Sequence, residues 1–166
     1  MKKILTVILA ALMLTLAIIP AAQAEEVASV AETYETNSTT VEYFEDGSYM
    51  VTTIKESPVA RSARSKSYVK VGVKTINLYD SDDVLQWTYE LTGRFQVVEG
   101  ESAVCIESSY TSNIYVKAWS LTAHNNYTRS NIAFGTATYK KKVLFITTST
   151  QDIDASIGCD INGNVG

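Results

Sequence analysis

The stretch from Leu85 to Val97 alternates between hydrophobic and polar side chains. The odd positions carry Leu85, Trp87, Tyr89, Leu91, Phe95 and Val97, and the even positions carry Gln86, Thr88, Glu90, Thr92, Arg94 and Gln96. A period of two over more than a dozen residues is typical of a β-strand that buries one face and exposes the other. A second layer must cover the hydrophobic face. Gly93 interrupts the hydrophobic series and predicts a bulge or bend.

The rest of the segment 68–166 indicates further short strands separated by turns. Strand-like runs lie at 68–79, 103–106, 114–121, 132–139, 143–150 and 153–161, and turns are expected at 80–83, 99–100, 124–126 and 140–142. The last run alternates again, with Ile153, Ala155, Ile157 and Cys159 on one face. No helical period of useful length follows the N-terminal 24 residues. Seven or so strands at this spacing predict an all-β fold, an antiparallel β-sandwich or a partly closed barrel.

A hairpin and a linker are expected ahead of the β-sandwich domain. Residues 39–55 place two β-rich runs on either side of Asp46-Gly47, which favours a type I′ hairpin turn. An isolated hairpin is barely stable in water, so we expect it to pack on the domain or to meet a partner. Residues 56–67 are basic, contain Pro58 and predict a flexible linker. Residues 25–38 are acidic and predict a solvated tail.

The N-terminus has the three regions of a secretory signal peptide. Two lysines are followed by an apolar run of about 16 residues and by small residues up to Ala24. We expect cleavage between Ala24 and Glu25, and a secreted, extracellular protein. The alternative is an uncleaved anchor, but the run is shorter than the ~20 residues that a membrane-spanning helix needs. No second run of spanning length follows, so no membrane span is expected after cleavage.

The charge of the chain limits the classes of partner that it is expected to bind. The formal net charge is −4, and removal of the first 24 residues with their two lysines makes it −6. Nucleic-acid binding needs clustered lysine and arginine, so nucleic acid is not expected as a partner. Anionic membranes are disfavoured for the same reason.

Two cysteines, Cys105 and Cys159, lie in the expected domain. An exported protein can form disulfides, and two cysteines allow one pairing. We therefore expect a disulfide between them, with two free buried thiols as the alternative. Trp119 lies between them, in the order Cys–Trp–Cys of immunoglobulin domains, but Ile157 occupies the place of the usual tyrosine. We take this as an analogy of architecture only.

The candidate sites for metal and acid–base chemistry are weak. Asp80, Asp82 and Asp83 could bind Ca²⁺, but the spacing of an EF-hand loop is absent and aspartate is a common turn residue. The segment 160–164 is better interpreted as a terminal turn. Asp152 and Asp154 share the polar face of a strand and could form a carboxylate pair. His124, the only histidine, is expected in a loop. We predict no catalytic residue, no metal site and no cofactor.

Aromatic residues give the one functional indication. Ten tyrosines and two tryptophans are many for this length, and exposed aromatic rings on β-sandwiches can stack on sugars. Trp87 is assigned to the core because its strand face is otherwise hydrophobic. The candidates that could face a ligand are Tyr110, Tyr115, Trp119 and Tyr127.

Four segments resemble a group of small secreted, β-rich proteins of Gram-positive, clostridia-like bacteria. They read EYFEDGSYMVTTIKE (42–56), LQWTYELTGRFQVVEGESAVCIES (85–108), YVKAWSLT (115–122) and CDINGNVG (159–166). The group has no assigned activity. The resemblance therefore implies export and a β domain, and gives no residue a role.

These observations leave three hypotheses for function. The first is a non-catalytic extracellular binding module for a cell-envelope glycan, a host glycan or a protein. The second is a small secreted effector, such as a bacteriocin or a self-assembling toxin, in which the 39–55 hairpin supplies edge-strand pairing. The third is a hydrolase, which would need the face of Asp152 and Asp154 to line a cleft.

Overall fold

Strand β4 (Leu85–Val98) lies at the centre of the fold and buries the face that its alternation predicts. The inward side chains of Trp87, Tyr89, Leu91, Phe95 and Val97 are all 0% exposed. The structure is a computed structural model, and it describes residues 35–58 and 66–166. The predicted signal peptide, the predicted cleavage site between Ala24 and Glu25 and residues 59–65 of the predicted linker lie outside the described residues.

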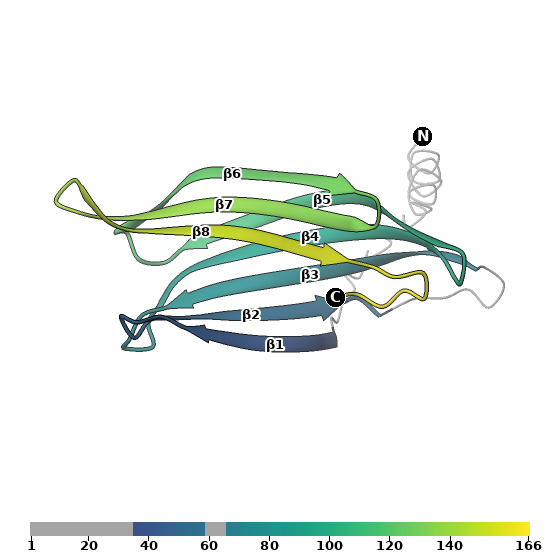
Figure 1. Cartoon of the computed structure of the whole chain (residues 1–166), viewed down its shortest axis with the longest axis horizontal. Coiled ribbons are helices and arrows are strands. Elements are labelled where there is room, and N and C mark those ends of the chain that lie inside the picture. Colours follow the sequence, from purple (N-terminus) through teal and green to yellow (C-terminus); the bar gives the residue numbers. More distant parts are fainter. Residues whose placement is uncertain (1–34, 59–65) are drawn as a thin grey trace, which may run out of the picture. The chain divides into compact units, whose positions relative to one another are not determined.

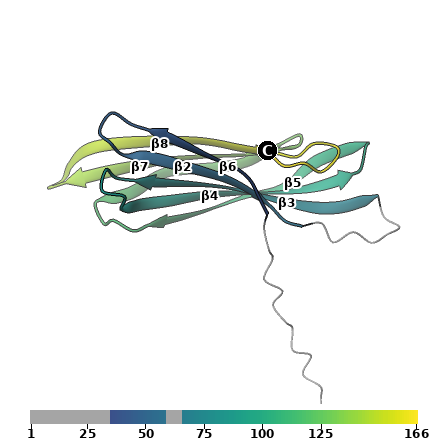
Figure 2. The same cartoon turned by 90° about the horizontal axis from the view of Figure 1, so that it is seen from below.

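The described residues form two antiparallel sheets, which confirms the predicted all-β sandwich (Figure 1). One sheet contains β1 (Glu35–Tyr43), β2 (Tyr49–Glu56), β3 (Ser67–Tyr79), β4 and β5 (Ser102–Ile114), in that order. The other contains β6 (Trp119–Arg129), β7 (Ile132–Val143) and β8 (Ile146–Gly158). Neighbours in sequence are neighbours in the sheet throughout, unlike the Greek-key order of immunoglobulin domains. The strand axes of the two layers are nearly aligned (Figure 2).

The two sheets interlock large side chains with small ones. The rings of Trp87 on β4 and Tyr139 on β7 stack with centroids 4.1 Å apart and an interplanar angle of 2°. A Cβ atom at Gly93 would lie 2.6 Å from the Phe95 ring and 3.0 Å from the Cβ of Ala133. Gly93 therefore permits close approach of the sheets. β4 has no extra residue at Gly93; the nearby register shift, between Arg94 and Phe95, has its extra residue on β5, at Ile106.

The predicted hairpin forms and becomes the edge of the five-stranded sheet, since β2 pairs with β3 along its whole length. Its first strand begins at Glu35, within the segment expected to be a tail. The turn, however, is not the two-residue type I′ turn that Asp46-Gly47 predicts. It spans five residues, 44–48, and only Gly47 has a positive φ, of 81°. Asp46 instead accepts hydrogen bonds from the N–H and hydroxyl of Ser48.

Several predicted loop and strand boundaries are wrong. Residues 107–113 continue β5 as one long strand, and the loop follows at 115–118. The segment His124-Asn125-Asn126, expected in a loop, lies within β6. The lysines 140–142, expected to form a turn, lie on β7. Backbone pairing with β7 and β8 holds these polar residues in strands, although side-chain type alone disfavours that conformation.

One edge of the sandwich is closed and the other is open. At the closed edge, Asn126 donates to the carbonyl oxygen of Ser108 (2.5 Å), and Ser108 donates to that of Phe134 (3.2 Å). The open edge arises because the second sheet has only three strands and the first has five, with β1 at its edge. Every β1 residue whose side chain is described is exposed. None of the described residues forms a helix long and apolar enough to cross a membrane.

Lysine 70 is the least expected residue of the interior. Its side chain is 6% exposed and its Nζ lies 3.1 Å from Oε1 of Glu56. The other carboxylate oxygen of Glu56 accepts the N–H of Val165, 3.3 Å away, in the C-terminal segment. The ion pair therefore fixes the end of the chain against β2 and β3.

Two tyrosines of the core are predicted to respond oppositely to loss of the hydroxyl group. The Tyr89 hydroxyl is buried without a hydrogen-bond partner, and burial raises the pKa of Tyr89 to about 12. The Tyr139 hydroxyl lies 2.6 Å from that of Ser112. Tyr89→Phe should therefore leave the free energy of unfolding unchanged or raise it by about 1 kcal/mol, and Tyr139→Phe should lower it by about 1 kcal/mol. Urea unfolding measures both, and equal destabilisation of the two variants would contradict the assignment.

Candidate functional site

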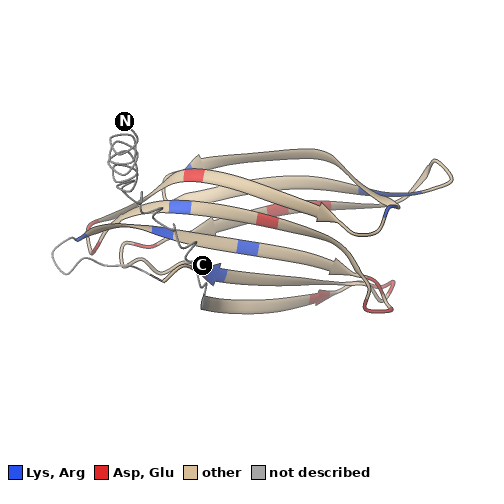
Figure 3. Cartoon of the chain, turned by 180° about the vertical axis from the view of Figure 1, so that it is seen from behind, with Lys and Arg blue, Asp and Glu red and all other residues tan. Residues whose placement is uncertain are grey.

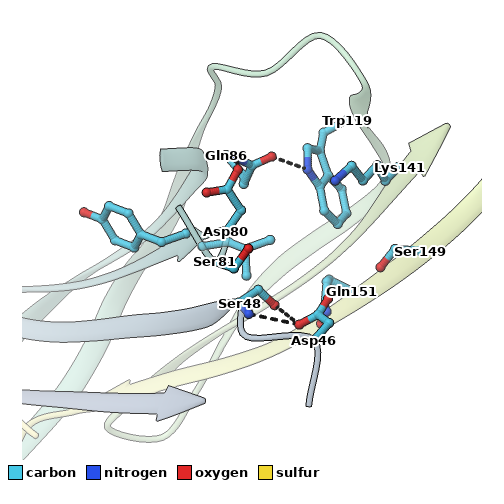
Figure 4. Close-up of a pocket in the computed structure, with 11 residues that line it drawn as sticks. Asp46, Ser48, Asp80, Ser81, Gln86, Trp119, Lys141, Ser149 and Gln151 are labelled. Carbon is cyan, nitrogen blue, oxygen red and sulfur yellow. Dashed lines mark hydrogen bonds between the residues drawn. The ribbon is translucent and has the colours of Figure 1, made fainter. Parts of the chain in front are cut away.

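A polar pocket lies where the β1–β2 turn, the β3–β4 turn and the paired ends of β7 and β8 meet (Figure 4). Its volume is about 170 Å³. The lining residues are Asp46, Ser48, Leu78, Tyr79, Asp80, Ser81, Gln86, Trp119, Lys141, Ser149 and Gln151. Seven strand ends or turns contribute, so no local run of sequence reveals the pocket.

Gln86 organises one wall of the pocket. Its Oε1 accepts the indole N–H of Trp119 (3.1 Å), and its Nε2 donates to Oδ2 of Asp80 (2.8 Å) and to the carbonyl oxygen of Val84 (2.9 Å). The alternation of β4 places Gln86 on the polar, outer series, yet it is only 3% exposed. A register shift between Leu78 and Tyr79 in the β3–β4 ladder accompanies this change.

Asp80 and Asp46 both act as turn residues at the rim. One oxygen of Asp80 accepts the N–H groups of Asp82 and Val84, each 3.0 Å away, and the other accepts Gln86. This is the arrangement of an aspartate that caps its own turn. The hydroxyl and N–H of Ser48 hold the pKa of Asp46 below its usual value, so Asp46 is anionic at neutral pH.

The remaining groups can serve a ligand. Among the residues that the structure describes, the side chains of Ser81, Ser149 and Gln151 have no hydrogen-bond partner. The Nζ of Lys141 lies 5.9 Å from the Trp119 ring centroid, over its face. Figure 4 shows Lys141 and Trp119 on one side of the pocket and Asp46 with Gln151 on the other. Hydroxyl, amide, carboxylate and ammonium groups thus surround one aromatic wall.

A row of tyrosines crosses the outer face of the five-stranded sheet beside this pocket. Tyr43 and Tyr49 pair across the hairpin with ring centroids 5.5 Å apart, and Tyr49 stacks on Tyr79 at 5.0 Å. The Tyr49 hydroxyl donates to Oδ1 of Asp83 (2.9 Å). Tyr43 is 75% exposed. The sequence analysis missed this row, because the two-residue turn expected at Asp46-Gly47 would pair Tyr43 with Met50. The five-residue turn that forms is centred on Asp46 and pairs Tyr43 with Tyr49.

The four aromatics predicted to face a ligand lie in different surroundings. Trp119 is 7% exposed, so it is a wall of the pocket and not an exposed platform. Tyr110 is half-buried and packs on His124, with ring centroids 4.5 Å apart. Tyr127 is exposed and stacks on Phe134 at 5.0 Å. Tyr115 is exposed in the 115–118 loop. Only Trp119 contributes to the pocket.

The two aspartates considered as a possible carboxylate pair lie elsewhere. Asp152 and Asp154 line a shallow groove beside the inner faces of β1, β2 and β3, together with Lys74 and Glu42. Asp152 accepts a hydrogen bond from the hydroxyl of Thr138 (2.7 Å). No cluster of three or more His, Cys, Asp or Glu able to hold a metal ion occurs within 35–58 and 66–166.

The expected disulfide between Cys105 and Cys159 is absent from this structure, in which both cysteines are free and buried. Their N–H groups donate to neighbouring carbonyl oxygens of the β6–β7 turn, on Ser130 and Asn131 respectively. Each thiol also donates to a nearby backbone carbonyl, on Glu107 and Asp160. The thiols thus occupy separate hydrogen-bonding positions, as in the alternative that the sequence left open.

We predict that both thiols are present and protected in the folded protein. Burial raises the pKa of Cys159 to about 11 and raises the pKa of Cys105 as well, so little thiolate forms at pH 8. A thiol-specific reagent should modify the native protein at least about a hundredfold more slowly than the denatured one. It should find two thiols per chain after denaturation. A count of zero would show a disulfide instead.

Comparison of the chain with protein-family models, with curated proteins and with solved structures found no match. The fold therefore defines the class of protein. It is an all-β protein of two antiparallel sheets.

Proposed function

We propose that this protein is a non-catalytic, extracellular binding module whose pocket receives a small hydroxyl-rich group, such as one sugar unit of a cell-envelope or host glycan. The observation that carries the proposal is the combination of the Trp119 wall with free polar groups of Ser149, Gln151 and Lys141. Sugars offer donors and acceptors on their edges and apolar C–H groups on their faces, and this lining matches both.

The tyrosine row supports a ligand longer than one unit. Tyr79 both lines the pocket and ends the row that continues through Tyr49 to Tyr43. A polymer with one unit in the pocket can lay the next units against these rings. The geometry of the row is fixed by its contacts, because Tyr49 is held by a hydrogen bond to Asp83 and by stacking on Tyr79.

Binding should depend on pocket side chains that do not hold the fold together. Lys141→Ala and Gln151→Ala remove a donor and an amide from the pocket, and each should weaken glycan binding about fivefold or more. Thr150→Ala, on the exposed face next to Gln151, is the matched control and should leave affinity unchanged. Titration of peptidoglycan fragments, mucin and a glycan panel, followed by tryptophan fluorescence, measures the affinities.

The outcomes separate the pocket from other modes of binding. Saturable binding that Lys141→Ala and Gln151→Ala leave intact would place the ligand elsewhere and contradict the proposal. Absence of binding to every polymer tested would do the same. Trp119→Ala is unsuitable as the first variant, because this buried residue also packs against Trp87 with centroids 6.3 Å apart.

One observation favours a second function, that of a self-assembling effector. Strand β1 is the edge of the five-stranded sheet, and Val41 on it is 47% exposed. An edge strand of nine residues can pair with a second copy. Assembly through β1 predicts concentration-dependent oligomers by sedimentation, and Val41→Lys should shift them to monomers at least about tenfold in dissociation constant. A monomer at all concentrations would exclude this function.

A further inference from the structure

The turn between β7 and β8 exposes four consecutive hydrophobic residues. Val143, Leu144, Phe145 and Ile146 are 50%, 85%, 99% and 68% exposed. In Figure 1 the β7–β8 hairpin extends beyond the other loops at the same end of the sandwich. We call these four residues the hydrophobic tip. The sequence analysis missed the tip because it placed the turn at the preceding lysines and assigned residues 143–150 to a strand.

The backbone of the tip is unfavourable for the residues that form it. Val143 pairs with Ile146, so the turn has two residues, Leu144 and Phe145, with positive φ angles of 46° and 71°. Positive φ at both central positions defines a type I′ turn, for which Asn-Gly is the preferred sequence. Large side chains seldom adopt this conformation. Here they do so without any compensating burial, so folding of the hairpin does not explain their presence.

Three lysines lie on one side of the base of the tip, on β7. Lys140, Lys141 and Lys142 precede it on β7, and Figure 3 shows positive residues at this base while the end of the hairpin carries no charge. Acidic residues at this end of the molecule include Asp46 on the β1–β2 turn and Asp82 and Asp83 on the β3–β4 turn. The β7–β8 hairpin extends beyond both of these turns (Figure 1). A hydrophobic end with three lysines on the strand that leads to it matches the layers of a membrane surface, with acyl chains below anionic headgroups.

We propose that the hydrophobic tip inserts into the interface of a lipid bilayer and that Lys140 and Lys142 bind anionic headgroups. The occupant is a bilayer and not a protein groove, because the tip is a narrow projection with positive charge at its base and offers no broad complementary face. The negative net charge of the chain disfavours anionic membranes, but attraction to a membrane depends on the local charge at the contact, which is positive here. The proposal is independent of the sugar pocket and concerns a different surface.

The test is binding to vesicles of phosphatidylcholine alone and of phosphatidylcholine with phosphatidylglycerol. The protein used begins at Glu25, which removes the hydrophobic N-terminal run and retains the whole compact unit 32–166. We expect co-sedimentation with both vesicles and tighter binding to the anionic ones. Leu144→Ser with Phe145→Ser should weaken binding at least about tenfold on both. Lys140→Ser with Lys142→Ser should weaken it about fivefold per lysine, on anionic vesicles only.

A second variant separates function from folding. Leu144→Asn with Phe145→Gly installs the preferred type I′ sequence, so the midpoint of thermal unfolding should rise by about 2–5 °C while vesicle binding is lost. The matched control is Val104→Ser with Ile106→Ser, which removes two side chains of 48% and 52% exposure from β5. It should retain vesicle binding, and so should Gln151→Ala.

Three results would overturn the proposal. The first is failure of the unmodified protein to bind either vesicle. The second is vesicle binding by Leu144→Asn with Phe145→Gly at the original affinity. The third is a dimer in solution that this double substitution dissociates, without vesicle binding, which would make a second copy the occupant of the tip.

Discussion

The packing of β4 against β7 holds the two sheets together, and the other features depend on it. Large rings project from β4 toward small residues of β7, namely Ala133, Gly135 and Ala137. Further along β7, Tyr139 stacks on Trp87. Ala133 and Ala137 are 0% and 3% exposed, so the rings of β4 reach the backbone of the opposite sheet. This match of large on small sets the spacing of the layers and removes the core from water. It also fixes the register in which β7 and β8 leave the sandwich.

The pocket and the hydrophobic tip lie at the same end of the sandwich, and the packing of β4 against β7 positions both. Trp119 lies edge-on to Trp87, and Gln86 ties its indole N–H to the Asp80 turn. The pocket is therefore attached directly to the core. The hydrophobic tip extends from the same hairpin that supplies Lys141, Ser149 and Gln151 to the pocket. If both proposals hold, a bilayer at the tip would bring the pocket close to headgroups and surface glycans.

The contrast between two turns explains why the sequence predicted the strands but not the types of the turns that connect them. Asp46-Gly47 carries the preferred chemistry of a type I′ turn, yet it forms a five-residue turn with an aspartate cap. Leu144-Phe145 carries none of that chemistry, yet it forms the two-residue turn with both φ angles positive. The pairing register of the strands on each side decides how many residues remain for a turn. Gln86 shows the same effect, since a register shift in the β3–β4 ladder accompanies burial of a residue that alternation assigns to solvent.

The alternation of residues 85–97 and 153–159 by itself determined that these segments are strands and which of their side chains face the core, because a strand with a period of two buries its hydrophobic face. The hairpin around Asp46-Gly47 was also predicted from local sequence, although the pairing of its strands decided the length of its turn. Tertiary structure alone decided that Gln86 joins Trp119 and Asp80, that Tyr43, Tyr49 and Tyr79 form a row, and that the lysines precede the turn. These depend on which strand lies beside which and in what register, and pairing between residues distant in sequence leaves no periodic trace in either strand.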